Sequence, residues 1–297
     1  MPRHLLEIDD LGVDELRAVL ELAARPDPPQ VLAQRGAALL FEKPSLRTRN
    51  SMEMAVVQLG GHPMTLRNEE IGLDTRESVE DVTRSLQCYH AVIAARVFEH
   101  SKLERMTKVA TVPIVNLLSD AGHPMQALAD VLTVQQLFGG FVGRKVAYVG
   151  DGNNVCRSLV LAAGMLGMDV AVASPAAYTM PDDDIARLRK VGVEPLLTED
   201  VAVAVDGADV IYTDAWYSMG QEAEANERRP VFRPYQVDAS MMARAGDGAV
   251  FLHCLPAHRG DEVTDEVVES ASSRVWQQAE NRMHAARGLL AWILEAS

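Results

Sequence analysis

The sequence has 297 residues, of which 48% are hydrophobic and 24% are charged, and its formal net charge is −14. This length is enough for about two domains, each with a core of its own. The acidic balance disfavours a protein that binds nucleic acid or anionic membranes in general, because its long-range field would repel polyanions. A local group of arginines can still bind a small phosphorylated substrate, since salt screens distant charges.

The sequence also shows no sign of a membrane or secreted protein. No apolar run approaches the roughly 20 residues that a membrane-spanning helix needs. The first residues, from Met1 to Glu7, lack the apolar core of a signal peptide and the acid-poor composition of a transit peptide. The cysteines Cys88, Cys156 and Cys254 show no paired spacing. We therefore expect a cytoplasmic protein without disulfides or a membrane partner.

Short apolar runs alternate with helical patterns through the first half of the chain. Strands are expected over residues 37–41, 91–97 and 112–117, and helices over residues 48–59, 78–86, 101–109 and 125–137. Ser101 is expected to cap the third helix, with Glu104 at capping-box spacing. The glycine pair at 139–140 is a natural end for the fourth, and we place the domain boundary there.

A second alternating series follows this boundary. Strands are expected over residues 145–149, 169–173, 193–197, 209–213 and 249–252, and helices over residues 155–165, 182–190, 200–205 and 280–294. Apolar strands joined by helices indicate parallel sheets. We predict an α/β fold of two doubly wound parallel-sheet domains, residues 1–138 and 139–279. The C-terminal helix, residues 280–297, is expected to pack back on the first domain.

In such sheets ligands bind beyond the carboxyl ends of the strands, so the loops there deserve inspection. The first of these loops contains Ser45, Arg47, Thr48 and Arg49, just before a predicted helix. Hydroxyls, guanidinium groups and the free N–H groups of a first helical turn together form an anion site. Taken alone, the string is equally typical of a capped surface helix with solvated arginines.

Two further strand ends favour the anion site. Arg96 ends a strongly apolar strand, where an arginine needs an anionic partner or water. His123 and Gln126 lie one turn apart at the start of the helix after the next strand. A lone histidine there is more often structural, but this combination indicates a polar site.

The second domain carries weaker individual signals. Residues 150–152 form Gly-Asp-Gly, but Val155 stands where a dinucleotide-binding motif has its third glycine. Asn154 can bind a polar ligand or cap a helix, and Asp214 places a carboxylate at a strand end. A zinc site at His253, Cys254 and His258 has too few soft ligands, so we expect no metal and no cofactor. A cysteine nucleophile at Cys254 is chemically possible, but no oxyanion hole or orienting third group can be assigned to it.

Together, these strings closely resemble the aspartate/ornithine carbamoyltransferase family. The similarity covers essentially the whole chain, in order. It includes residues 41–49, 123–130, 150–154, 214–220, 253–260 and 279–282.

The resemblance implies that the first domain binds carbamoyl phosphate and the second binds an amino acid, ornithine, with the active site in the cleft between the two domains. Its carbamoyl phosphate-binding positions correspond to Ser45, Leu46 (through its amide), Arg47, Thr48, Arg96, His123, Gln126, Cys254, Leu255 and Arg282. Its ornithine-binding positions correspond to Asn154, Asp214, Ser218 and Met219. Catalytic roles are implied for Arg96, His123, Cys254 and Arg282, which would stabilise charge on the carbonyl oxygen or contact the reacting amine.

Two positions depart from the family pattern: Leu46 replaces a threonine, and Met125 replaces a cysteine. Neither change removes a charge, so we expect activity. The resemblance also implies a homo-oligomer, a trimer or a multiple of trimers.

Three alternatives remain open at this point. A carbamoyltransferase could use putrescine, N-acetylornithine or aspartate as its acceptor, although Asp214 and residues 218–220 favour ornithine. An oxidoreductase would bind NAD(P), which the missing third glycine disfavours. An inactive scaffold gains some support from Leu46 and Met125.

Overall fold

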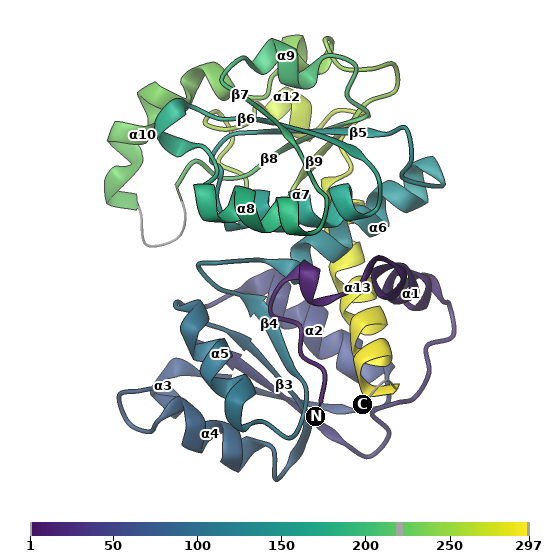
Figure 1. Cartoon of the computed structure of the whole chain (residues 1–297), viewed down its shortest axis with the longest axis vertical. Helices are drawn as coiled ribbons and strands as arrows, with labels where there is room; N and C mark the ends of the chain where they lie inside the picture. Colours follow the sequence, from purple (N-terminus) through teal and green to yellow (C-terminus); the bar gives the residue numbers. More distant parts are fainter. Residues whose placement is uncertain (1, 218–221, 296–297) are drawn as a thin grey trace. The chain divides into compact units, whose positions relative to one another are not determined.

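The computed structural model describes residues 2–217 and 222–295. The chain divides into two compact units (Figure 1). Unit 1 comprises Met1–Leu132 and Glu280–Ser297, and unit 2 comprises Thr133–Ala279. None of the helices in the described part of the chain combines the length and apolarity needed to cross a bilayer.

Unit 1 contains a parallel sheet with the strand order β2-β1-β3-β4. Its strands are β1 (Gly36–Phe41), β2 (His62–Arg67), β3 (His90–Arg96) and β4 (Ile114–Leu118). Its helices are α1 (Val13–Ala24), α2 (Leu46–Gln58), α3 (Asn68–Ile71), α4 (Val79–Leu86) and α5 (His100–Val109). Two longer helices, α6 (Pro124–Phe138) and α13 (Val275–Glu295), each span the boundary between the units.

The chain direction across this sheet reverses between β1 and β3. From β1 the chain moves outward to β2, then returns to add β3 and β4 on the other side. The switch point of this sheet therefore lies between β1 and β3, and doubly wound sheets bind ligands beyond the carboxyl ends of the strands at such a point. The apolar interior strands explain this order, because β1 and β3 are almost completely buried whereas β2 is a partly exposed edge.

The C-terminal part of α13 packs on α1. A Cβ atom at Gly288 would lie 2.5 Å from the backbone of Val19 and Ala23, so only glycine permits this close approach. Arg287 fixes the same contact by donating hydrogen bonds from its guanidinium group to the carbonyl oxygens of Ala23 and Arg25.

Unit 2 contains a parallel sheet with the order β7-β6-β5-β8-β9. Its strands are β5 (Lys145–Val149), β6 (Asp169–Ala173), β7 (Leu196–Thr198), β8 (Val210–Thr213) and β9 (Val250–His253). Its helices are α7 (Asn154–Met165), α8 (Asp182–Lys190), α9 (Val201–Val205), α10 (Ala225–Phe232), α11 (Ala239–Met242) and α12 (Asp265–Val268). Figure 1 shows α7 and α8 on one face of the sheet and α9 and α12 on the other. Its switch point lies between β5 and β8.

The two predicted parallel sheets are confirmed, but several details of the prediction were wrong. Strand β2 was missed because its polar, half-exposed sequence lacks an apolar run. Helices α1 and α10 were missed as well. Ser101 does not cap α5, which begins one residue earlier at His100, where Asp120 accepts the backbone N–H. Strand β7 is shorter and later than predicted, and α13 begins at Val275, before the predicted residue 280.

Candidate active site

In unit 1, the loop after β1 leads into the amino end of α2. Ser45 is the N-cap residue, and its hydroxyl accepts a hydrogen bond from the backbone N–H of Thr48 at 3.3 Å. The first turn of this 13-residue helix therefore presents N–H groups and a partial positive charge beside the switch point. Arg47 lies in this turn, whereas the Leu46 side chain points outward and is 74% exposed. Only the backbone of Leu46 can thus take part in anion binding.

Positive charge gathers around the ends of β1 and β3. Arg96 is the register partner of Phe41, and its carbonyl oxygen accepts a hydrogen bond from the backbone of Glu42. Lys43, in the same loop, has a lowered pKa because its ammonium is partly buried and lies near the Arg96 guanidinium. Like charges held this close favour the binding of an anion.

His123 lies at the start of α6 and is buried. Burial lowers its pKa well below the ordinary value, and the nearby charges of Arg282 and Arg96 lower it further. The imidazole is therefore neutral at physiological pH and can donate a hydrogen bond without adding a third positive charge.

A buried hydrogen-bond network joins α2, α6 and α13. The guanidinium of Arg282 donates to the side-chain oxygen of Gln126 at 2.6 Å and to the hydroxyl of Thr48 at 3.1 Å. Gln126 in turn donates to Asp130 at 2.7 Å. All four side chains are at most 3% exposed. The network fixes the direction of the Arg282 guanidinium, so that charge is preorganised in the site.

We predict that His123 makes folding sensitive to mild acid. The unfolded histidine takes up a proton near pH 6.5, but the buried ring has a lowered pKa and does not. Stability should therefore fall as pH drops below about 6.5, by at most ~1.4 kcal/mol per pH unit for one proton. Urea unfolding at pH 7.5 and 5.5 tests this: His123→Asn should lose less stability on acidification than the wild type. An equal loss in both proteins would contradict the prediction.

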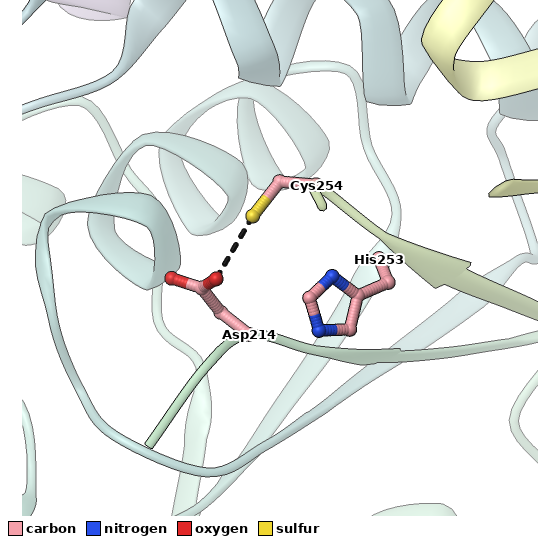
Figure 2. Close-up of side chains that lie close together, drawn as sticks. All are labelled: Asp214, His253 and Cys254. Atoms are coloured by element: carbon pink, nitrogen blue, oxygen red, sulfur yellow. Dashed lines mark hydrogen bonds between the residues drawn. The ribbon is translucent and has the colours of Figure 1, made fainter. Parts of the chain in front are cut away.

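In unit 2, the side chains that follow β5, β8 and β9 meet at one edge of the sheet. Asp214 follows β8, and its Oδ1 accepts hydrogen bonds from the Cys254 thiol at 2.9 Å and from the backbone N–H of Ala215 at 2.7 Å. Its Oδ2 accepts a hydrogen bond from the Asn153 amide at 3.0 Å. Figure 2 shows the Cys254 thiol directed at Asp214. A carboxylate held in this way, and only 9% exposed, is suited to bind a cationic group.

Asn153 has two tasks in this arrangement. Its side-chain oxygen caps α7 by accepting hydrogen bonds from the backbone N–H groups of Val155 and Cys156. Its amide nitrogen holds Asp214.

Two substitutions of Asn153 separate these tasks. Asn153→Ser keeps an N-cap oxygen but loses the contact with Asp214, and Asn153→Ala loses both. We expect both variants to raise the KM for the ligand of Asp214 about tenfold, corresponding to roughly 1.4 kcal/mol, whereas the alanine variant alone should lower the melting temperature markedly. Kinetics and thermal melts of both variants provide the check. A serine variant with unchanged KM would show that Asn153 serves only as a cap.

The trio Asp214, His253 and Cys254 brings three possible metal ligands within 4.8 Å of one another (Figure 2). However, both ring nitrogens of His253 are engaged. Nδ1 accepts the backbone N–H of Leu255 at 2.8 Å, and Nε2 lies 3.2 Å from Glu262. A metal would have to break one of these buried bonds, so the donor set does not fit a metal site.

The structure places the other predicted residues as follows. Asn154 is the first residue of α7, directly after Asn153, and Leu255 follows Cys254 in the turn after β9. Met125 is buried in α6 and contributes to packing. Ser218 and Met219 lie outside the described residues.

Three further residues near these sites were not predicted from the sequence. Lys43 is close to Arg96, Asn153 orients Asp214, and Glu262 contacts His253. Only Asn153 had a usable signal, because asparagine is a typical N-cap residue. The prediction offered Asn154 as the possible cap of a helix at 155–165, but the helix begins one residue earlier and Asn153 caps it. Glu262 is nine residues from His253, and only the folded turn brings them together.

Comparisons with known proteins match both units. The family model "Aspartate/ornithine carbamoyltransferase, carbamoyl-P binding domain" matches residues 3–136, and "Aspartate/ornithine carbamoyltransferase, Asp/Orn binding domain" matches residues 142–293. An "Ornithine carbamoyltransferase" of Acidothermus cellulolyticus is 46% identical, over 100% of this chain and 98% of that protein. An "Ornithine carbamoyltransferase, anabolic" of Pyrococcus furiosus is 45% identical, over 98% of this chain and 96% of that protein. The solved structure of ornithine carbamoyltransferase from Pyrococcus furiosus superposes with a TM-score of 0.94 at 44% identity, covering 100% of this chain and 98% of that one.

Proposed function

The chain belongs to the aspartate/ornithine carbamoyltransferase family, and we propose that it transfers the carbamoyl group of carbamoyl phosphate to the side-chain amine of L-ornithine. The products are L-citrulline and phosphate. One observation carries this proposal. Unit 1 has a positively charged site suited to an anion at its switch point, and unit 2 has a buried carboxylate beside its own switch point.

In this proposal the carbamoyl phosphate-binding domain is residues 1–138 with the C-terminal helix 280–297, which contains all of unit 1. The phosphate is bound by Ser45, the Leu46 amide, Arg47, Thr48 and Arg96. Gln126 binds the NH₂ group of the carbamoyl moiety. Supporting this assignment, the N-terminal turn of α2 supplies backbone donors and hydroxyls, and the charges of Arg96 and Lys43 lie beside it.

The ornithine-binding domain of the proposal is residues 139–279, which lie within unit 2. Asp214 and Asn154 bind the amino acid together with Ser218 and Met219, and Cys254 and Leu255 lie beside the reacting amine. This assignment is supported by the hydrogen bond from the Cys254 thiol to Asp214, because it places a thiol and a carboxylate within reach of one cationic group.

The chemistry follows from these positions. Ornithine must lose the proton of its side-chain ammonium, and Asp214 with Cys254 controls that protonation. The neutral amine then attacks the carbonyl carbon, a C–N bond forms, and the C–O bond to phosphate breaks. The attacking nitrogen loses its extra proton to the leaving phosphate. Negative charge on the carbonyl oxygen is stabilised by Arg96, Arg282 and the neutral His123, and each such donor contributes about 3 kcal/mol. Arginine contacts neutralise the leaving phosphate.

Product analysis with several acceptors tests the proposal. We expect citrulline from carbamoyl phosphate and ornithine, with kcat/KM at least about 100-fold higher for ornithine than for putrescine, N-acetylornithine or aspartate, because a site that binds the polar ends of a substrate rejects analogues that lack them. Equal or faster carbamoylation of another amine would remove ornithine as the acceptor. Absence of every carbamoylated product would favour the inactive scaffold.

We also propose that the protein is a homo-oligomer, a trimer or a multiple of trimers. Supporting this, apolar side chains are exposed on α2 and on the edge strand β2: Leu46, Met54, Val57 and Met64 are 42–74% exposed. A second copy of the chain would cover this face. Sedimentation should give a mass of three chains or a multiple of three, and Val57→Lys should lower it. A monomer in the wild type would overturn this proposal.

The cytoplasm and arginine synthesis are the setting we propose for the reaction, and the anabolic relative supports this direction. Disruption of the gene should create a requirement for arginine that citrulline also relieves. Growth without either would contradict the assignment.

A further inference from the structure

A completely buried carboxylate lies behind the Cys254 turn and has no part in the proposed chemistry. The Glu262 side chain is 0% exposed. Its Oε1 accepts hydrogen bonds from Nε2 of His253 at 3.2 Å and from the backbone N–H of His258. Burying a charged group is costly unless it is hydrogen-bonded, so this arrangement is expected to serve a purpose beyond packing.

The contacts of His253 determine which of its nitrogens carries the proton. Nδ1 accepts the backbone N–H of Leu255 at 2.8 Å, so this nitrogen must be unprotonated. Nε2 then carries the proton and donates a hydrogen bond to Glu262. The carboxylate therefore holds the imidazole as a neutral ring in one tautomer, with its acceptor nitrogen facing Leu255.

Leu255 needs such a restraint. Its φ is 59°, a left-handed conformation that side chains of L-residues disfavour. Conformations of this kind persist only where neighbouring contacts enforce them. The bond from Leu255 to His253 lies directly beside Cys254, whose thiol contacts Asp214. Figure 2 shows the His253 ring next to this bonded Cys254–Asp214 pair.

We infer that Glu262 and His253 are positioning residues that hold the backbone of Cys254 and Leu255 in its reactive geometry. Glu262 fixes the tautomer of His253, so that Nδ1 can accept a hydrogen bond from the backbone N–H of Leu255. This second hydrogen bond keeps the turn in place. The inference deepens the proposed function and rests on it, because Cys254 and Leu255 matter only if the reacting groups meet there.

Substitutions of Glu262 test the first link. Glu262→Gln keeps an oxygen that can accept from Nε2, whereas Glu262→Leu removes it. We expect kcat to fall at least 100-fold in the leucine variant and less than tenfold in the glutamine variant. The KM for ornithine should change less than fivefold in both, because Asp214 and Asn153 stay in place. Glu266→Gln, the same change at an exposed acid four residues away, should leave kcat unchanged.

Substitutions of His253 test the second link and do not depend on the folding of the leucine variant. An asparagine oxygen reaches the position of Nδ1 and can accept from Leu255, whereas a glutamine oxygen reaches the position of Nε2. The kcat of His253→Asn should therefore be at least tenfold higher than the kcat of His253→Gln. In the wild type, ¹⁵N spectra of labelled histidine should show His253 as the Nε2–H tautomer, and this signature should persist in Glu262→Gln.

Three results would overturn the inference. They are a folded Glu262→Leu protein with kcat within threefold of the wild type, equal kcat in the two His253 variants, or a wild-type His253 that is protonated on Nδ1. A wild type that makes no citrulline would instead refute the proposed function. The tautomer spectrum would still report on His253 in that case.

Discussion

Replacing Arg282 with alanine is expected to lower kcat/KM for carbamoyl phosphate by about three orders of magnitude, corresponding to roughly 4 kcal/mol. Arg282 is 3% exposed and is held by Gln126 and Thr48, so its charge points into the site without reorganisation. Removing it deletes a stabilising group for the carbonyl oxygen and leaves the oxygen of Gln126 without this donor. Steady-state kinetics at varied carbamoyl phosphate provide the measurement.

The same helix supplies a matched control. Arg287 is also buried in α13, but it donates to Gln58 and to backbone carbonyls near the end of α1. Arg287→Ala should lower the melting temperature and leave kcat/KM within about threefold. Arg282→Lys should be intermediate, because lysine keeps the charge but not the forked donor geometry. If Arg282→Ala and Arg287→Ala had equal kinetics, Arg282 would have only a structural role.

Replacing Asp214 with asparagine is expected to lower kcat/KM for ornithine by about 100-fold, since a hydrogen bond to a charged group contributes roughly 1.5–3 kcal/mol. Both oxygens of Asp214 accept hydrogen bonds, Oδ1 from Cys254 and Ala215 and Oδ2 from Asn153. In the variant, the asparagine NH₂ group, itself a donor, would face one of these donors. The variant therefore loses a hydrogen bond as well as the negative charge. The KM for carbamoyl phosphate should change less than about threefold.

Asp209 provides the control at the opposite end of the same strand. It accepts hydrogen bonds from Arg144 and from the backbone of Lys145, immediately before β8. Asp209→Asn should lower stability by about 1 kcal/mol and leave ornithine kinetics unchanged. An Asp214→Asn enzyme with wild-type kinetics for ornithine would contradict the proposed binding mode.

The sheets could be predicted from sequence because their interior strands are short, apolar runs bounded by helical patterns. Strand β2 could not be, since an edge strand has one side in water and its composition is polar. Helix α1 was overlooked although its apolar residues Leu16, Val19, Leu20 and Ala23 follow helical spacing. The helical signal was therefore present in the sequence.

The positions of candidate residues could be predicted where these residues lie at strand ends. Ser45 and Asp214 follow strands and Arg96 ends one, and the switch points of the two sheets explain why ligands are expected there. Arg282 required the family resemblance, because it lies within a helix far along the chain from Thr48 and Gln126. Contacts such as Glu262 with His253 depend on the path of a turn, which composition and spacing do not encode.

The most direct measurement is a crystal structure with phosphonoacetyl-ornithine, which joins a carbamoyl phosphate mimic to the amino acid acceptor. We expect the phosphonate to contact Ser45, Arg47 and Thr48, and the ornithine part to contact Asp214. The carbonyl oxygen of the inhibitor should lie within hydrogen-bond distance of His123 and Arg282. A phosphonate bound elsewhere, or an ornithine part that does not reach Asp214, would contradict the proposed function.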